Sequence, residues 1–136
     1  MTIDVQFEFQ PNYMKLICKG IFDGDALIEA YEHAFTLAAS KGYGAFLADI
    51  RDVTGGPPST MDRYDGGVQF AMLQREVGQG IAVAFVGNVP LVDPERFAEV
   101  VAANRGAFAR VFTDHDEAVD WLENEARTGT SGRGWR

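Results

Sequence analysis

The sequence has little cysteine and little histidine. Cys18 is the only cysteine among 136 residues, and His33 and His115 are the only histidines. A single cysteine cannot form an internal disulfide, so a cytoplasmic, reducing location is expected. Cys18 ends the apolar run Leu16-Ile17-Cys18, which favours a buried, inert thiol over a nucleophile. The two histidines lie far apart in sequence, and we expect both at the surface rather than in a metal site.

Basic residues are scarce as well. Twelve Lys and Arg stand against twenty Asp and Glu, a formal net charge of -8. This balance opposes nonspecific binding to nucleic acid or to anionic membranes, so neither is an expected partner. No apolar run approaches the ~20 residues of a membrane span. Asp4 and Glu8 also interrupt any apolar core of a signal peptide.

The remaining composition is that of one globular domain. Hydrophobic residues make up 46% and charged residues 24% of the chain, close to globular averages. A chain of this length can bury a stable hydrophobic core without disulfide bonds or structural metal ions. We expect a single domain over residues 1–126 and a flexible tail over 127–136, which is rich in Gly, Thr and Ser.

Apolar periodicity predicts an α/β fold with a mixed sheet of five strands and four main helices. Alternating residues over 3–9 and a second run over 13–19 flank the turn Pro11-Asn12 and predict an antiparallel hairpin. Further strands are expected over 45–50, 81–86 and 110–112. Helices are expected to begin near Asp25, Ser59, Asp93 and Asp114, each with a capping side chain or acidic first turn.

Several side chains are expected to face the core from these helices. Trp121 should be largely buried and anchor the last helix, so that its replacement by alanine would cost about 3 to 5 kcal/mol. The other positions expected to face inward are Met61, Tyr64, Val68, Met72 and Leu73 in the second helix, and Phe97, Val100 and Val101 in the third. Gly66-Gly67 interrupts the second helix; we favour close packing on the sheet, with a hinge or a close ligand as the alternative.

Polar residues are dense just after the third predicted strand, where open α/β sheets place ligands. The candidate binding residues there are Asp49, Arg51, Asp52, Ser59, Thr60 and Arg63. A helix start with Arg51 and Arg63 would suit an anion. Asp49, Asp52 and Asp62 could instead gather a divalent cation. In the interpretation that we favour, the carboxylates cap helices and pair with the arginines, so no metal and no cofactor is expected.

Three segments together resemble the bacterial SpoIIAA-like proteins, which are related in fold to STAS domains and to CRAL-TRIO lipid-transfer domains. The resemblance covers roughly residues 13–123. Its markers are Phe46-Leu47-Ala48-Asp49-Ile50-Arg51-Asp52-Val53 before a glycine, Ile81-Ala82-Val83, and Arg110-Val111-Phe112 with Glu117-Ala118 and Trp121-Leu122. It implies a mixed sheet with helices packed against it.

STAS domains of anti-sigma-factor antagonists carry a phosphorylatable serine after the third strand, in an Asp-Ser-x-Gly context at a helix start. Here the motif is absent, and Val53-Thr54-Gly55-Gly56-Pro57-Pro58 precedes Ser59 and Thr60. Ser59 or Thr60 takes a similar place, so the resemblance makes these two the candidate phosphosites.

The sequence carries no GxGxxG, P-loop, GxSxG or CxxC motif, and no nucleophile, base and orienting group lie close together. We therefore predict a noncatalytic, STAS-like regulatory module that acts through protein or small-ligand binding. The alternative is a protein that binds an apolar, lipid-like ligand in a cavity beneath the first and second helices. A homodimer is a further open alternative.

Overall fold

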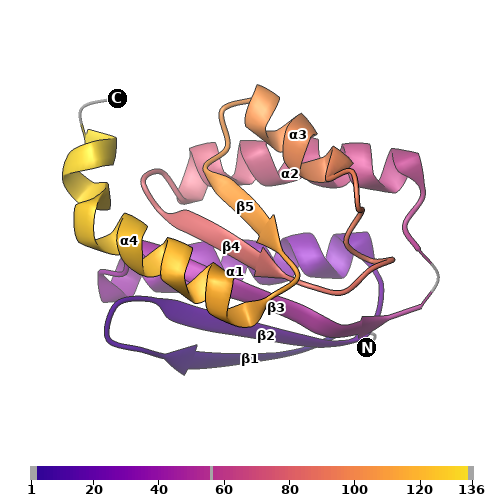
Figure 1. Ribbon diagram of the computed structural model, residues 1–136, viewed down its shortest axis with the longest axis horizontal. Coiled ribbons are helices and arrows are strands. Elements are labelled where there is room, and N and C mark those ends of the chain that lie inside the picture. Colours follow the sequence, from indigo (N-terminus) through magenta and orange to yellow (C-terminus); the bar gives the residue numbers. More distant parts are fainter. Residues whose placement is uncertain (1–2, 56, 135–136) are drawn as a thin grey trace.

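A computed structural model describes residues 3–55 and 57–134, and for residues 126–134 only the backbone. It contains five strands and four helices that alternate after an initial hairpin (Figure 1). The elements are β1 Ile3–Phe9, β2 Met14–Ile21, α1 Gly24–Lys41, β3 Ala45–Thr54, α2 Thr60–Val77, β4 Ala82–Val86, α3 Phe97–Asn104, β5 Ala109–Phe112 and α4 His115–Gly134.

The strands form one mixed sheet in the order β1-β2-β3-β4-β5. The β1–β2 pair is antiparallel, and every later pair is parallel. The predicted fold class is therefore confirmed, including the initial hairpin. The carboxyl ends of β2, β3, β4 and β5 meet at one edge of the sheet, which we call the carboxyl edge.

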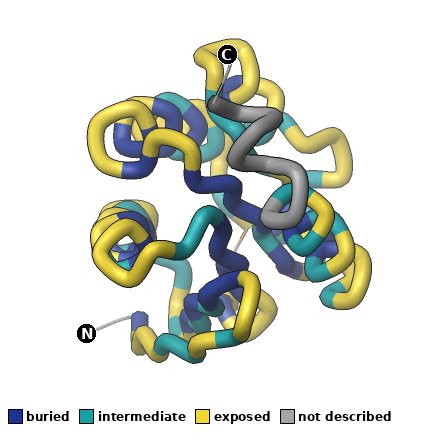
Figure 2. Tube along the Cα trace, turned by 90° about the vertical axis from the view of Figure 1, so that its left-hand side faces the viewer, coloured by how far each residue is buried: buried dark blue, intermediate teal, exposed yellow. Residues whose placement is uncertain are grey.

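Helices cover both faces of the sheet, and the buried strands lie between them (Figure 2). On one face, α1 and α2 pack over a core that includes Phe35, Phe46 and Phe70. On the other face, α4 packs Ala118 and Leu122 over β3 and β4. Because successive strand residues point to opposite faces, Phe46 belongs to the first core and its neighbour Leu47 to the second.

The helix ends follow the capping signals in the sequence. Asp23 accepts a bond from the Ala26 N–H and caps α1, which ends at Gly42 with a left-handed φ of 81°. Asp114 accepts a bond from the Asp116 N–H at the start of α4. α4 continues to Gly134, past the domain end predicted at 126. Residues 135–136 lie outside the described residues, and the flexibility of 127–136 stays a prediction.

The inward face of α2 differs from the predicted one. Met61, Tyr64 and Met72 are exposed, whereas Gly67, Phe70, Ala71, Leu73 and Gln74 are buried. Gln74 is buried because it has backbone partners: its Nε2 donates to the carbonyls of Ile81 and Phe108, and its Oε1 accepts from the Phe108 N–H. The prediction is therefore wrong for Met61, Tyr64 and Met72 and right for Leu73, which faces the core together with Phe70.

Three further expectations need correction. The third predicted helix begins at Phe97 rather than near Asp93, because Arg96 adopts a left-handed φ of 58° that interrupts the helix. Asp93 still caps it by accepting from the Phe97 N–H. Val100 is exposed, while Val101 is buried. Trp121 is only half-buried, because it packs at the edge of the α4 core against Phe108 and Phe112.

Candidate functional site

Asp49 and Arg51 lie within β3, which continues to Thr54 and so extends past the predicted strand end. Their side chains form a bidentate ion pair: Arg51 Nε donates to Asp49 Oδ1 at 2.9 Å, and Nη2 donates to Oδ2 at 2.7 Å. The Arg51 backbone N–H also donates to Asp49 Oδ1 at 3.1 Å. These two predicted site residues therefore satisfy each other, as the favoured interpretation held.

The electrostatics of the pair follow from this geometry. Burial raises the pKa of Asp49, but the hydrogen bonds and charge of Arg51 outweigh it and hold that pKa below the ordinary value. The bond to Asp49 in turn raises the pKa of Arg51. Both groups therefore stay ionised at neutral pH.

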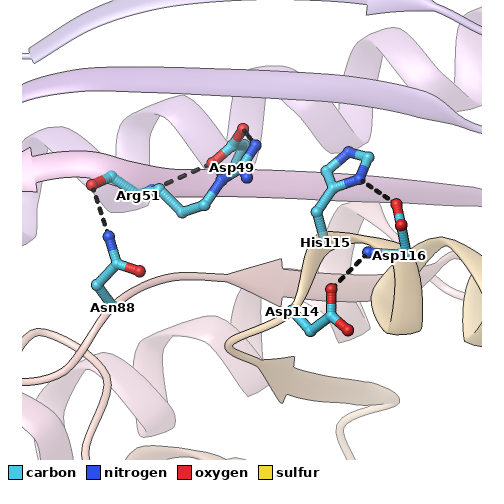
Figure 3. A network of polar contacts seen from close by, with 6 residues as sticks. All are labelled: Asp49, Arg51, Asn88, Asp114, His115 and Asp116. Carbon is cyan, nitrogen blue, oxygen red and sulfur yellow. Dashed lines mark hydrogen bonds and ion pairs between the residues drawn. The ribbon is translucent and has the colours of Figure 1, made fainter.

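Polar groups from other elements lie close to this pair (Figure 3). Asn88 Nδ2 donates to the Arg51 carbonyl at 3.3 Å. At the start of α4, His115 Nδ1 lies 3.3 Å from Asp116 Oδ1. His115 Nε2 is buried and has no partner in the part of the chain that the structure describes. The sequence did not connect Asn88 or His115 with Asp49, because only the parallel pairing of β3, β4 and β5 brings their ends together.

The histidine and cysteine predictions have mixed outcomes. His33 is exposed, as expected, and its ring packs edge-on against Phe7. His115 is only partly exposed, because its side chain is 26% exposed and its Nε2 is buried. Cys18 is fully buried. Burial raises its pKa to about 11, which leaves an inert thiol at neutral pH.

Ser59, Thr60 and Arg63 lie at the start of α2, across the sheet from the Asp49–Arg51 pair. The Ser59 hydroxyl accepts from the Asp62 N–H, and Asp62 accepts from the Ser59 N–H, which confirms the predicted capping box. Arg63 donates to the carbonyls of Pro58, Pro90 and Leu91. Its guanidinium therefore connects the loop before α2 with the loop after β4. Thr60, also at the start of α2, is exposed.

The six predicted residues thus form two separate groups. Asp49 follows Ala45 and Leu47 in strand alternation and so points toward the α4 face, whereas α2 covers the opposite face. Asp52, which pairs with Lys19 of β2 in register, is exposed. Among the described residues, no three Asp, Glu, His or Cys side chains form a group that could hold a metal ion. Asp49, Asp52 and Asp62 therefore do not gather as the cation hypothesis required.

Exposed apolar side chains mark the carboxyl edge. Ile21, Met61 and Val89 are 62%, 65% and 56% exposed, more than any other large hydrophobic residue described. Ile21 ends β2 opposite Thr54, Met61 is in the first turn of α2, and Val89 follows β4. We call Ile21, Ser59, Thr60, Met61 and Val89 the carboxyl-edge surface. Sequence reasoning assigned Met61 to the core and singled out neither Ile21 nor Val89.

A cavity of about 180 Å³ lies behind this surface, between the sheet and the helices α1, α2 and α3. Its lining is mostly apolar and includes Phe22, Tyr31, Phe70 and Phe85. Gly66 and Gly67 of α2 line it as well. The cavity lies beneath the first two helices, where an apolar-ligand site was expected, and α3 forms part of its wall.

Within the described residues, no helix combines the length and the apolar character that a membrane crossing requires. The sequence matches no protein-family model and no curated protein at a significant level.

Solved structures, by contrast, resemble this one over most of its length. The crystal structure of an anti-sigma factor antagonist from Mycobacterium paratuberculosis matches with a TM-score of 0.58 and 15% identity, over 89% of this chain and 94% of that chain. An uncharacterised protein from the DUF3478 family with a SpoIIAA-like fold, from Shewanella loihica, matches with a TM-score of 0.50 and 20% identity, over 89% and 93%. The chain therefore has a SpoIIAA-like fold.

Proposed function

We propose that the chain is a noncatalytic regulatory module that binds a protein partner through the carboxyl-edge surface. The observation that carries this proposal is the exposure of Ile21, Met61 and Val89 at one edge of the sheet. Covering apolar side chains that are exposed to water at one place lowers the free energy of the complex and so favours binding. Thr60 and Ser59, the N-cap residue of α2, precede Met61 and supply polar groups for specificity.

The polar residues nearby support a binding role over a catalytic one. Asp49 and Arg51 bind each other, and Ser59 is held by Asp62 in the capping box. Arg63 donates to three backbone carbonyls. None of these groups forms the nucleophile–base pair that covalent or general-base catalysis requires.

The fold comparison supports one class of partner. The Mycobacterium paratuberculosis neighbour is an anti-sigma factor antagonist, and we assign an anti-sigma factor as the partner of this chain too. The partner would supply an apolar surface to cover Met61 and its neighbours. The net charge of -8 favours a partner with a basic contact surface, because opposite charges speed association.

Titration calorimetry with the purified anti-sigma factors of the source organism tests this function. Met61→Asp and Val89→Asp should each weaken binding at least tenfold, because a carboxylate cannot be buried unpaired in the interface. Met72→Asp is the matched control: it changes an equally flexible, exposed side chain of α2, three turns away, and should leave affinity unchanged. Equal losses for all three variants, or no binding by any anti-sigma factor, would overturn the proposal.

Ser59 and Thr60 remain the candidate phosphosites within this function. A phosphate on either would lie at the N-terminus of α2, where the helix dipole and free N–H groups favour negative charge. Comparing Ser59→Glu and Thr60→Glu with wild type in the same titration, with phosphopeptide mapping of the protein from its cells, tests the assignment. Unchanged affinity in both variants, with neither hydroxyl modified, would remove it.

The second candidate function, binding of an apolar ligand, is favoured by one specific observation. The cavity of about 180 Å³ is lined by apolar side chains and lies beneath α1 and α2. Ligand binding in the cavity is independent of protein docking at the carboxyl-edge surface, because different residues form the two sites.

A further inference from the structure

We propose that the cavity between α1, α2 and α3 binds a small neutral molecule consisting of one apolar ring and a single hydrogen-bonding group. This inference deepens the second candidate function, apolar-ligand binding, and is independent of the docking function. It rests on the size of the cavity, on the hydroxyl group of one lining residue, on the charges at its rim and on Gly66.

The size of the cavity limits the ligand. Its volume is about 180 Å³, and a cavity of roughly 150 Å³ lined by Leu, Ile and Phe stays dry and binds benzene. A six-membered ring with one substituent therefore fills the space, and a long acyl chain does not fit. The lining rings also suit an aromatic guest: Tyr31, Phe70 and Phe85 meet edge to face, with centroids 5.2 to 6.1 Å apart.

Tyr31 brings the one polar group of this aromatic cluster. The residue is only 7% exposed and lines the cavity. Its hydroxyl forms no hydrogen bond with any residue that the structure describes. Burial raises the pKa of Tyr31, so the hydroxyl keeps its proton and can donate. Because no described residue accepts from this hydroxyl, a ligand oxygen in the cavity is the acceptor that we assign to it.

The charged residues at the rim are already engaged, and this favours a neutral ligand. Arg63 donates to three backbone carbonyls, and Asp62 caps α2. Asp93 accepts from the Glu95 and Phe97 N–H groups. Glu99 accepts from the Val111 N–H and lies 3.9 Å from Arg96. Pairing an ionised ligand with Asp62, Arg63 or Asp93 would compete with these backbone bonds.

Gly66 keeps this side of the cavity open. It lines the cavity four residues before Phe70, on the same helical face. A Cβ placed at Gly66 meets no atom within 4 Å, whereas one at Gly67 would lie 2.7 Å from the Ala98 carbonyl oxygen. The space beside Gly66 is therefore free for a larger side chain, which provides a way to fill the cavity from within α2.

Phenol and toluene are matched probes, because they share shape and size and differ in one hydroxyl. We expect both to bind saturably to the wild-type chain, as followed by amide shifts of Gly66, Phe70 and Ala102 in NMR titrations. Tyr31→Phe removes only the hydroxyl of the protein. It should weaken phenol about fivefold, as expected for a hydrogen bond of ~1 kcal/mol, and leave toluene within about twofold.

Gly66→Leu tests the location. This substitution should abolish saturable binding of both probes, because the leucine side chain would occupy the cavity. The control variant Met72→Leu changes a residue on the exposed face of α2, and it should bind both probes as the wild type does. Amide spectra of each variant without probe establish that it is folded. Saturable binding unchanged in Gly66→Leu, no binding to the wild type, or equal effects of Tyr31→Phe on the two probes would overturn the proposal. None of these outcomes bears on the anti-sigma factor titration, which uses different residues.

Discussion

Gly66 and Gly67 are adjacent in α2 and have different structural reasons to be glycine. Gly67 allows α3 to approach, since an added Cβ would lie 2.7 Å from the Ala98 carbonyl oxygen and 2.9 Å from Val101 Cβ. Gly66 faces open space. The favoured prediction from the sequence, close packing, therefore holds for Gly67, although the packing partner is α3 rather than the sheet.

Alanine at these two positions should have opposite effects on stability. Gly66→Ala should stabilise the protein by up to about 1 kcal/mol, because alanine is the better helix former. Gly67→Ala should destabilise it by about 1 to 3 kcal/mol, because α2 and α3 would have to move apart. Urea denaturation at neutral pH measures both. A loss of stability in Gly66→Ala would contradict the open space assigned to that position.

The Asp49–Arg51 ion pair should make the free energy of unfolding depend on pH. The folded-state pKa of Asp49 lies below its ordinary value, so the pair adds stability that is fully present above the unfolded pKa of about 3.9. That stability is lost as pH falls through the lower, folded-state pKa. Arg51→Met removes the partner, so the wild type should exceed it in unfolding free energy at pH 7, and the difference should shrink below about pH 4.

The measurement is a series of urea titrations of the two proteins from pH 7 to pH 3. A constant difference between wild type and Arg51→Met at all pH values would mean that the ion pair is not the source. Arg51 is therefore a poor probe of docking, because its replacement also affects the fold.

At the scale of helices and strands, local signals in the sequence predicted which elements form, and in what order. The capping residues Asp23, Ser59 and Asp114 lie at helix starts, and Gly42 ends α1. Such signals act within a few residues, so a sequence displays them directly. The start of α3 escaped prediction because the left-handed Arg96 has no comparable sequence signal.

Apolar periodicity predicted the inward face of α2 only in part, at Leu73. Its apolar residues Met61 and Met72 point to solvent, and the buried Gln74 is stabilised by bonds to residues 7 and 34 positions away. Those partners exist only after β4 and β5 are in place. For the same reason, candidate site residues could be named from the sequence, but their division between two faces of the sheet could not. The cavity had no local signal either, because three helices enclose it.

Leu122, rather than Trp121, should be the main anchor of α4. Leu122 is fully buried, whereas Trp121 is half-buried against Phe108 and Phe112. Leu122→Ala should therefore cost about 3 kcal/mol and Trp121→Ala about 2 kcal/mol, below the range for a fully buried tryptophan. Chemical denaturation monitored by circular dichroism checks the order. A larger loss for Trp121→Ala would show that the aromatic contacts outweigh the depth of burial.

At the scale of the whole molecule, the sheet joins two cores. Alternate residues of β3 and β4 enter opposite cores, so that Phe46 and Leu47 are covalent neighbours in different layers. Loss of either layer would expose one face of the same strands to water. The layers should therefore unfold together, as small single domains usually do.

Substitutions in the two layers should accordingly shift one shared transition. Phe35→Leu weakens the α1 side, where Phe35 contacts Phe46 and Phe70, and Leu122→Ala weakens the α4 side. In each variant, Trp121 fluorescence in a Trp135→Phe background and far-UV circular dichroism should report the same urea midpoint, lower than that of the parent. If fluorescence in Leu122→Ala changed at lower urea than circular dichroism, α4 would be unfolding separately, and the sheet would not couple the two cores.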